Sequence, residues 1–128
     1  MNAWLLAAAI VIALTGLAHS VGGEWLIFRT LRRGGVVPSG GQPVLRGYQT
    51  RILWANWHLV TVLGWALAAL LLWLAQPGPG AASGGIIERG VVVALLTGGS
   101  LVLWSNRGRH PGWIALWMAA ALVLVSLR

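Results

Sequence analysis

All three histidines of the chain and one of its two carboxylates are expected in one layer, roughly 10 Å thick, on the same side of the long apolar segments. His19 is followed by Ser20 and Glu24, and His58 follows Asn56 at a spacing of two residues. Imidazole nitrogen and carboxylate oxygen are ordinary ligands of zinc, iron, manganese and copper. Because polar groups inside a bilayer are costly, they are usually paired or functional. These residues are therefore the first candidates for chemistry.

The hypothesis that fits these residue types is a metal centre. The predicted metal ligands are His19, Glu24, His58 and His110, and the residues expected to support them are Ser20, Arg51 and Asn56. The bound group would be a divalent transition-metal ion or haem. The chain has no HExxH or similar local motif, so the centre depends on separate helices converging. The same side chains suit two alternatives, a proton-conducting or ligand-binding polar site and a hydrogen-bonded network that only stabilises the fold.

Helical geometry limits which of these side chains share a face. His19 and Glu24 are five residues apart, about 140° around a helix axis, so they face one site only if the helix unwinds at the two glycines between them. On the next apolar segment, Trp54, His58 and Thr61 recur at spacings of four and three. These three side chains are therefore expected on one face.

The elements that position these residues are those of a membrane protein. The 128-residue chain is 58% hydrophobic, and only 9% of its residues are charged, well below the ~25% usual in soluble domains. The absence of cysteine excludes disulfides, thiolate metal sites and cysteine nucleophiles. The absence of aspartate excludes a Ser/His/Asp triad, and the sequence indicates no particular enzyme class.

Four continuous apolar segments predict an all-α membrane protein, a bundle of four transmembrane helices forming a single membrane domain over residues 1–128. The predicted spans are residues 3–24, 52–75, 86–105 and 111–127, and an Arg-rich loop covers residues 29–51. Glu88 is expected in the first turn of the third helix, where the helix dipole favours a carboxylate.

Arginine placement predicts the orientation of these spans. The loop between the first two spans holds five of the nine arginines, and two more lie in the turn before the fourth span: Arg29, Arg32, Arg33, Arg46, Arg51, Arg107 and Arg109. Arg89 and Arg128 fall on the opposite side. By the positive-inside rule, both termini are expected on the non-cytoplasmic side of a bacterial inner membrane. The histidines then lie toward the cytoplasm.

The expected partner is the lipid bilayer. Most of the nine tryptophans lie near predicted span ends, where Trp anchors helices at the membrane interface. The Arg-rich loop could attract anionic lipid headgroups at about 1 kcal/mol per basic residue. Small residues at four-residue spacing, such as Gly64 with Ala68, favour close helix contacts and leave a homo-oligomer or a membrane partner open. The net charge of +7 is attributed to orientation, so no nucleic-acid partner is predicted.

Two segments carry a resemblance to known proteins. The run AHSVGGE, residues 18–24, and the run RILWANWHLVT, residues 51–61, resemble the AHSxxGE-like and RxxWHxT-like segments of a group of small bacterial four-span inner-membrane proteins. The resemblance implies a four-span architecture and places His19, Glu24, Arg51 and His58 in the shared segments. It implies no activity.

Three functions therefore remain open from the sequence. The preferred one is an integral membrane protein with a cytoplasm-proximal His/Glu site that binds a metal ion or haem. The second is a small oligomeric transporter or channel in which the same groups relay protons or hold a substrate. The third is an accessory subunit of a larger membrane complex.

Overall fold

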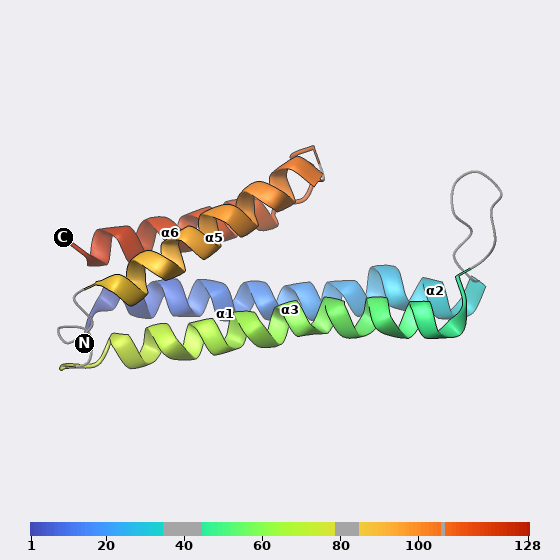
Figure 1. Ribbon diagram of the computed structural model, residues 1–128, viewed down its shortest axis with the longest axis horizontal. Helices are drawn as coiled ribbons and strands as arrows, with labels where there is room; N and C mark the ends of the chain where they lie inside the picture. The colour runs from blue at the N-terminus through green and yellow to red at the C-terminus, as the bar shows by residue number, and fades with distance from the viewer. Residues whose placement is uncertain (35–44, 79–84, 106) are drawn as a thin grey trace. The chain divides into compact units, whose positions relative to one another are not determined.

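A computed structural model describes residues 1–34, 45–78, 85–105 and 107–128, and every regular element in these ranges is a helix (Figure 1). The first helical rod joins α1 (Ala3–Gly23), the π-helix η1 (Glu24–Phe28) and α2 (Arg29–Gly34). The others are α3 (Gly47–Leu74), α5 (Ile86–Ser105) and α6 (Gly112–Ser126). The all-α prediction is confirmed for the described residues.

Three helical stretches are long and apolar enough to cross a membrane: Ala3–Leu31, Gly47–Leu74 and Ile86–Trp104. The fourth predicted span forms a shorter apolar helix, α6, whose 15 residues give a length of about 22 Å. Helix α3 begins at Gly47, before the predicted span at residue 52. Apolarity marks the part of a helix that suits lipid, whereas the helix itself continues as long as backbone hydrogen bonds are made.

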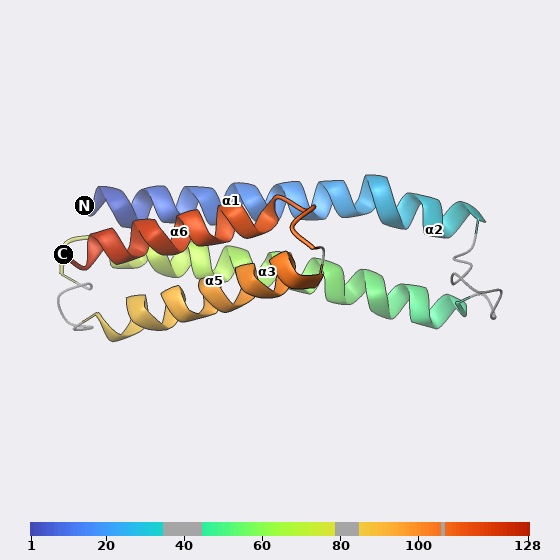
Figure 2. The ribbon, with the colours of Figure 1, turned by 90° about the horizontal axis from the view of Figure 1, so that it is seen from above.

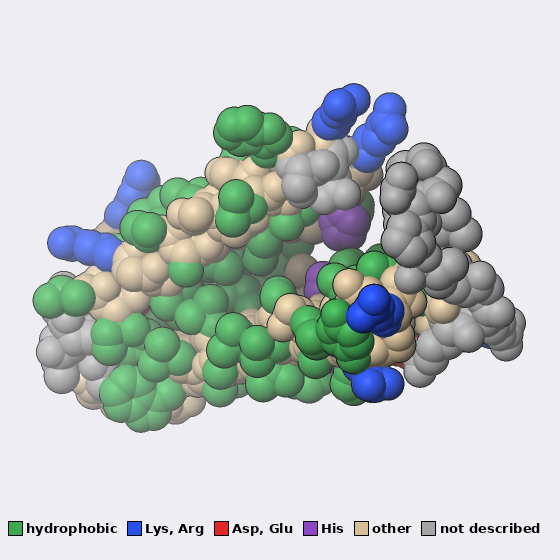
Figure 3. Space-filling model, turned by 45° about the vertical axis from the view of Figure 1, so that its right-hand side comes forward, with side chains coloured by type: hydrophobic (Ala, Val, Ile, Leu, Met, Phe, Trp, Pro, Cys, Tyr) green, Lys and Arg blue, Asp and Glu red, His purple; other side chains and the backbone are tan. Residues whose placement is uncertain are grey.

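Most of the apolar surface of these helices faces outward. In the three candidate spans, only 22%, 22% and 28% of the most apolar window is buried within the chain. On the face shown in Figure 3, hydrophobic side chains are exposed along the helices. Because a soluble monomer rarely exposes large contiguous apolar patches, this surface suits a hydrocarbon surrounding. The chain is therefore described as a membrane-embedded helical protein.

The chain forms two compact units, which we call unit 1 (Met1–Thr15 with Gly64–Arg128) and unit 2 (Gly16–Leu63). Helices α1 and α3 contribute their opposite halves to the two units. Unit 1 contains the start of α1, the end of α3, and all of α5 and α6. Unit 2 contains the end of α1, η1, α2 and the start of α3, and it carries most of the predicted site residues.

Unit 1 is held together by a core of aliphatic and small side chains. Its largest fully buried side chains are Leu71, Leu74 and Val123. The buried residues that form this core are Leu5, Ala8, Ala9, Ile12, Ala68, Leu71, Leu74, Ala75, Val91, Val92, Leu95, Ala119, Ala120 and Val123. Its alanines allow the helix backbones to approach closely.

Helices α5 and α6 of unit 1 lie side by side in both ribbon views (Figures 1 and 2). A Cβ atom at Gly99 on α5 would lie 2.6 Å from Nε1 of Trp117 on α6, so only glycine leaves room for the indole. The turn between these helices contains Arg107 and Gly108, both with positive φ (50° and 76°). This backbone reverses the chain sharply and brings α6 back along α5.

Candidate functional site

A chain of hydrogen bonds in unit 2 links the end of α1 to the first half of α3. The hydroxyl Oγ of Ser20 lies 2.8 Å from Nδ1 of His58 and 2.9 Å from Oγ1 of Thr61. The Thr61 hydroxyl in turn donates to the carbonyl oxygen of Gly16 at 3.3 Å. Because Gly16 and Ser20 belong to α1 and His58 and Thr61 to α3, these hydrogen bonds hold the two helices against each other.

This chain determines the proton positions. A carbonyl oxygen only accepts, so the single hydroxyl proton of Thr61 goes to Gly16 and its oxygen accepts from Ser20. The single hydroxyl proton of Ser20 is then used, so its oxygen accepts from Nδ1 of His58. The neutral imidazole of His58 therefore carries its proton on Nδ1 and a lone pair on Nε2. That Nε2 atom is buried and has no hydrogen-bond partner among the described residues.

Aromatic rings surround the two imidazoles of unit 2. The ring of Trp54 is tilted by 58° to that of His58 with centroids 4.6 Å apart, and Phe28 approaches the same imidazole at 6.2 Å. The ring of Trp57 stacks on that of His19 at 4.2 Å with an interplanar angle of 4°. Phe28 also meets Trp57 edge to face at 5.8 Å. The two imidazoles are thus connected through the rings of Trp57 and Phe28, and Trp54 adds a further ring contact to His58.

The Trp57 ring is positioned by two contacts with α1. Its Nε1 donates to the carbonyl oxygen of His19 at 3.0 Å. A Cβ atom placed on Gly23 would overlap the indole, so the ring occupies space that only a glycine leaves open. Gly22, in contrast, has nothing within 4 Å of such an atom. The two neighbouring glycines therefore have different roles, and only Gly23 makes room for the ring.

Glu24 begins the π-helix η1, directly after α1. Its Oε2 accepts a hydrogen bond from Nε1 of Trp54 at 3.2 Å, so this carboxylate is tied to α3. The helix does not unwind at the glycines: Gly23 keeps right-handed helical dihedrals (φ −59°, ψ −45°), and η1 follows without a break. The condition under which His19 and Glu24 would face one site, an unwound helix, is therefore not met; a π-helical stretch follows instead, a feature often found at functional sites.

The four predicted metal ligands are divided between the two units. Among the residues that the structure describes, no group of three or more His, Cys, Asp or Glu side chains is placed to hold a metal ion. His19, Glu24 and His58 lie in unit 2, whereas His110 lies in unit 1. His110 is exposed, and its Nδ1 accepts a hydrogen bond from the backbone N–H of Gly112 at 3.1 Å, at the start of α6.

The residues expected to support the site divide similarly. Ser20 contacts His58 directly, as described above, whereas Arg51 and Asn56 are exposed on α3. The structure adds Thr61, only 3% exposed, which the sequence placed on the His58 face of the helix without assigning it a role. It also adds Trp57, one of the tryptophans that the sequence places near the end of a predicted span. The stacking of Trp57 on His19 had no signal in the sequence.

Comparison with known proteins gave no match to a family model, to a curated sequence or to a solved structure. The site is therefore interpreted from its own geometry.

Proposed function

We propose that this protein is an integral membrane protein whose unit 2 binds a transition-metal centre through Nε2 of His58. The observations that carry the proposal are the 2.8 Å contact between Nδ1 of His58 and Oγ of Ser20 and the buried Nε2, which has no partner among the described residues; together they lead to the inferred Nδ1–H tautomer. Metal-binding histidines typically donate the second ring N–H to a fixed acceptor, which orients the ring and raises its basicity. The Ser20 and Thr61 hydroxyls supply that acceptor.

The proposal includes the placement of the chain in a bacterial inner membrane. Helix α6 is taken as the fourth span, because a short apolar helix can cross where the bilayer thins around it. The arginine distribution supports termini on the non-cytoplasmic side, with the α2 end of unit 2 near the cytoplasm. Exposed tryptophans such as Trp25 and Trp104, 71% and 85% exposed, suit the interface with lipid headgroups on the cytoplasmic side, where the first and third spans end.

The ligand set favours a metal that needs few protein donors. His58 is one donor, and His19 and Glu24 of the same unit are the candidates for a second. Haem would bring its own nitrogen ligands and would need only one or two imidazoles from the protein, whereas a bare divalent ion would take its remaining ligands from water or a second copy. Because Nε2 of His58 has almost no exposed surface, binding of either group requires a neighbouring ring such as Trp54 to move.

The test uses the full-length protein in lipid nanodiscs, loaded separately with haem and with iron, zinc, copper or manganese ions. Absorbance measures haem and elemental analysis measures the ions. We expect one of these groups to bind stoichiometrically and to be lost in His58→Ala. A matched control is Thr15→Ala, because Thr15 bonds only to Val11 of its own helix in unit 1. Absence of every group from the wild type, or unchanged loading of His58→Ala, would overturn the proposal.

A further inference from the structure

The start of α3 in unit 2 gathers two arginine side chains on one ordered helical turn. Arg46 is anchored there, because its backbone N–H donates to Oε1 of Gln49 at 2.7 Å and its carbonyl oxygen accepts from the N–H groups of Gln49 and Thr50. Nη1 of Arg51 lies 3.6 Å from the position that a Cβ atom on Gly47 would take. The Arg51 guanidinium therefore lies back toward the first turn of α3, next to Arg46 in the chain.

These two arginines are not neutralised within the chain. Both are exposed, and neither side chain forms an ion pair with any residue that the structure describes. Unit 2 contains five arginines but one carboxylate side chain, that of Glu24. Oε2 of Glu24 already accepts a hydrogen bond from Nε1 of Trp54. The positive charge at the start of α3 is therefore available to an anion from outside the chain.

Exposed apolar side chains follow directly after these arginines. Ile52 and Leu53, the two residues after Arg51, are 55% and 47% exposed. On η1 of the same unit, Trp25 and Leu26 are also exposed. On the face shown in Figure 3, arginine side chains border hydrophobic ones. Because α3 belongs to a membrane-embedded protein, this pattern matches an amphiphile that has an anionic headgroup and a hydrocarbon tail.

We propose that the start of α3 binds an anionic phospholipid, whose phosphate contacts Arg46 and Arg51 and whose acyl chain lies along Ile52 and Leu53. A guanidinium group matches phosphate because its planar fork of donors forms two parallel hydrogen bonds with the oxygens. A zwitterionic lipid fits less well, because the excess of arginine repels its ammonium group. A soluble phosphate fits less well, because it leaves the adjacent apolar side chains uncovered.

The experiment is a competition between two lipids for the full-length protein. Detergent micelles contain equal amounts of phosphatidylglycerol and phosphatidylcholine with identical acyl chains, and native mass spectrometry counts the lipids of each kind that stay bound. We expect phosphatidylglycerol to be retained in preference, and the preference to fall as salt is added. Soluble glycerol 3-phosphate should not displace the bound lipid. Equal retention of the two lipids, or displacement by glycerol 3-phosphate, would overturn the proposal.

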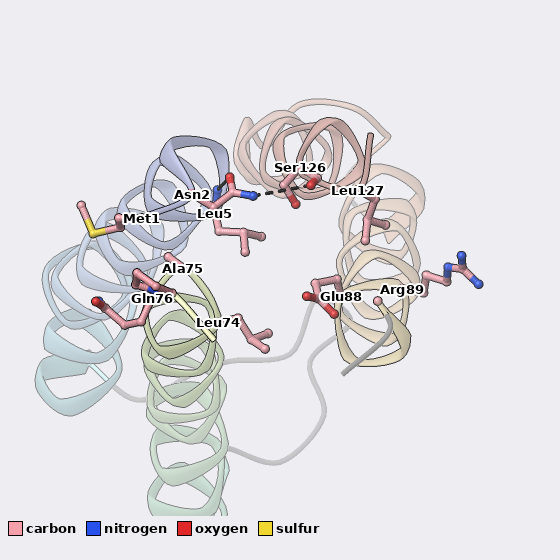
Figure 4. Close-up of a pocket in the computed structure, with 12 residues that line it drawn as sticks. Met1, Asn2, Leu5, Leu74, Ala75, Gln76, Glu88, Arg89, Ser126 and Leu127 are labelled. Atoms are coloured by element: carbon pink, nitrogen blue, oxygen red, sulfur yellow. Dashed lines mark hydrogen bonds between the residues drawn. The ribbon is translucent and has the colours of Figure 1, made fainter. Parts of the chain in front are cut away.

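The matched variants replace single exposed arginines with glutamine. Arg46→Gln and Arg51→Gln should each lower the preference for phosphatidylglycerol about fivefold, the effect expected of one basic residue near an anionic lipid surface. The control is Arg89→Gln in unit 1, which removes the same charge. Arg89 is also exposed but follows Glu88 in the chain, and Figure 4 shows its side chain extending away from the pocket that Glu88 lines.

We expect Arg89→Gln to leave the lipid preference unchanged. An equal loss in all three variants would mean that total charge sets the preference, and no loss in Arg46→Gln and Arg51→Gln would mean that the lipid contacts other residues. Either result would overturn the proposal. Metal loading through His58 is measured separately, so either proposal can fail while the other stands.

Discussion

Replacing Thr61 with valine tests the hydrogen-bond chain on which the site depends. Thr61→Val keeps the branched shape but removes the hydroxyl that accepts from Ser20 and donates to Gly16. Thr61 is 3% exposed, so neither water nor lipid replaces the lost partners. Hydrogen bonds between membrane helices contribute on average ~0.6 kcal/mol each, so losing two of them should lower the free energy of unfolding by about 1 kcal/mol.

The assay is equilibrium unfolding of the full-length protein in mixed micelles, with Thr15→Val as the matched control. Thr15 donates only to the Val11 carbonyl of its own helix, so its replacement should cost less than about 0.5 kcal/mol. A Thr61→Val variant as stable as Thr15→Val would refute the role of this series of hydrogen bonds in joining α1 and α3.

The same substitution should move a proton. Without Thr61 as an acceptor, the Ser20 hydroxyl is released to donate to Nδ1 of His58, and the imidazole proton then moves to Nε2. Nitrogen chemical shifts of ¹⁵N-labelled histidine distinguish the two tautomers. We expect the wild-type His58 to be protonated at Nδ1 and the variant at Nε2. A wild-type proton on Nε2 would contradict the argument, because that atom would then have no lone pair for a metal.

Two further substitutions test packing in the two units. Gly23→Ala should destabilise unit 2 by about 1–3 kcal/mol because its Cβ would overlap the ring of Trp57, whereas Gly22→Ala should have little effect. Equilibrium unfolding measures the stability of both variants. Equal stabilities would contradict the close contact between Gly23 and Trp57. Leu71→Ala should cost about 2–5 kcal/mol because Leu71 is fully buried, and Leu72→Ala, 42% exposed, should cost much less. If the two leucine variants have the same free energy of unfolding, the core of unit 1 is assigned wrongly.

The helical architecture follows from the sequence because it depends on local properties. Continuous apolar runs predict helices, and the third one, residues 86–105, matches α5 at both ends. The start of α3 at Gly47 differs from the predicted residue 52, because hydropathy shows which part of a helix suits lipid and not where its hydrogen bonds begin. The π-helix from Glu24 to Phe28 had no such signal, since nothing in the composition of EWLIF distinguishes it from an α-helix.

The candidate site was predicted only in part. The face shared by Trp54, His58 and Thr61 follows from helical spacing. The ring contact between Trp54 and His58 and the hydrogen bond that Thr61 accepts from Ser20 both occur on that face. The partner of His58, Ser20, lies 38 positions away, so only packing of the two helices could bring them together. The contact of His110, in contrast, is local. Its Nδ1 accepts a hydrogen bond from the backbone N–H of Gly112, two residues along the chain at the start of α6.

The sequence by itself determined that this chain is helical and suited to a membrane, because backbone groups in lipid must bond within their own segment and apolar side chains must face hydrocarbon. Only the tertiary structure decided which polar groups meet. The proton positions on His58 depend on a carbonyl and two hydroxyls from two helices. The environment of Glu88 depends on the ends of four helices in unit 1. Such contacts join residues far apart in the chain, and no local pattern encodes them.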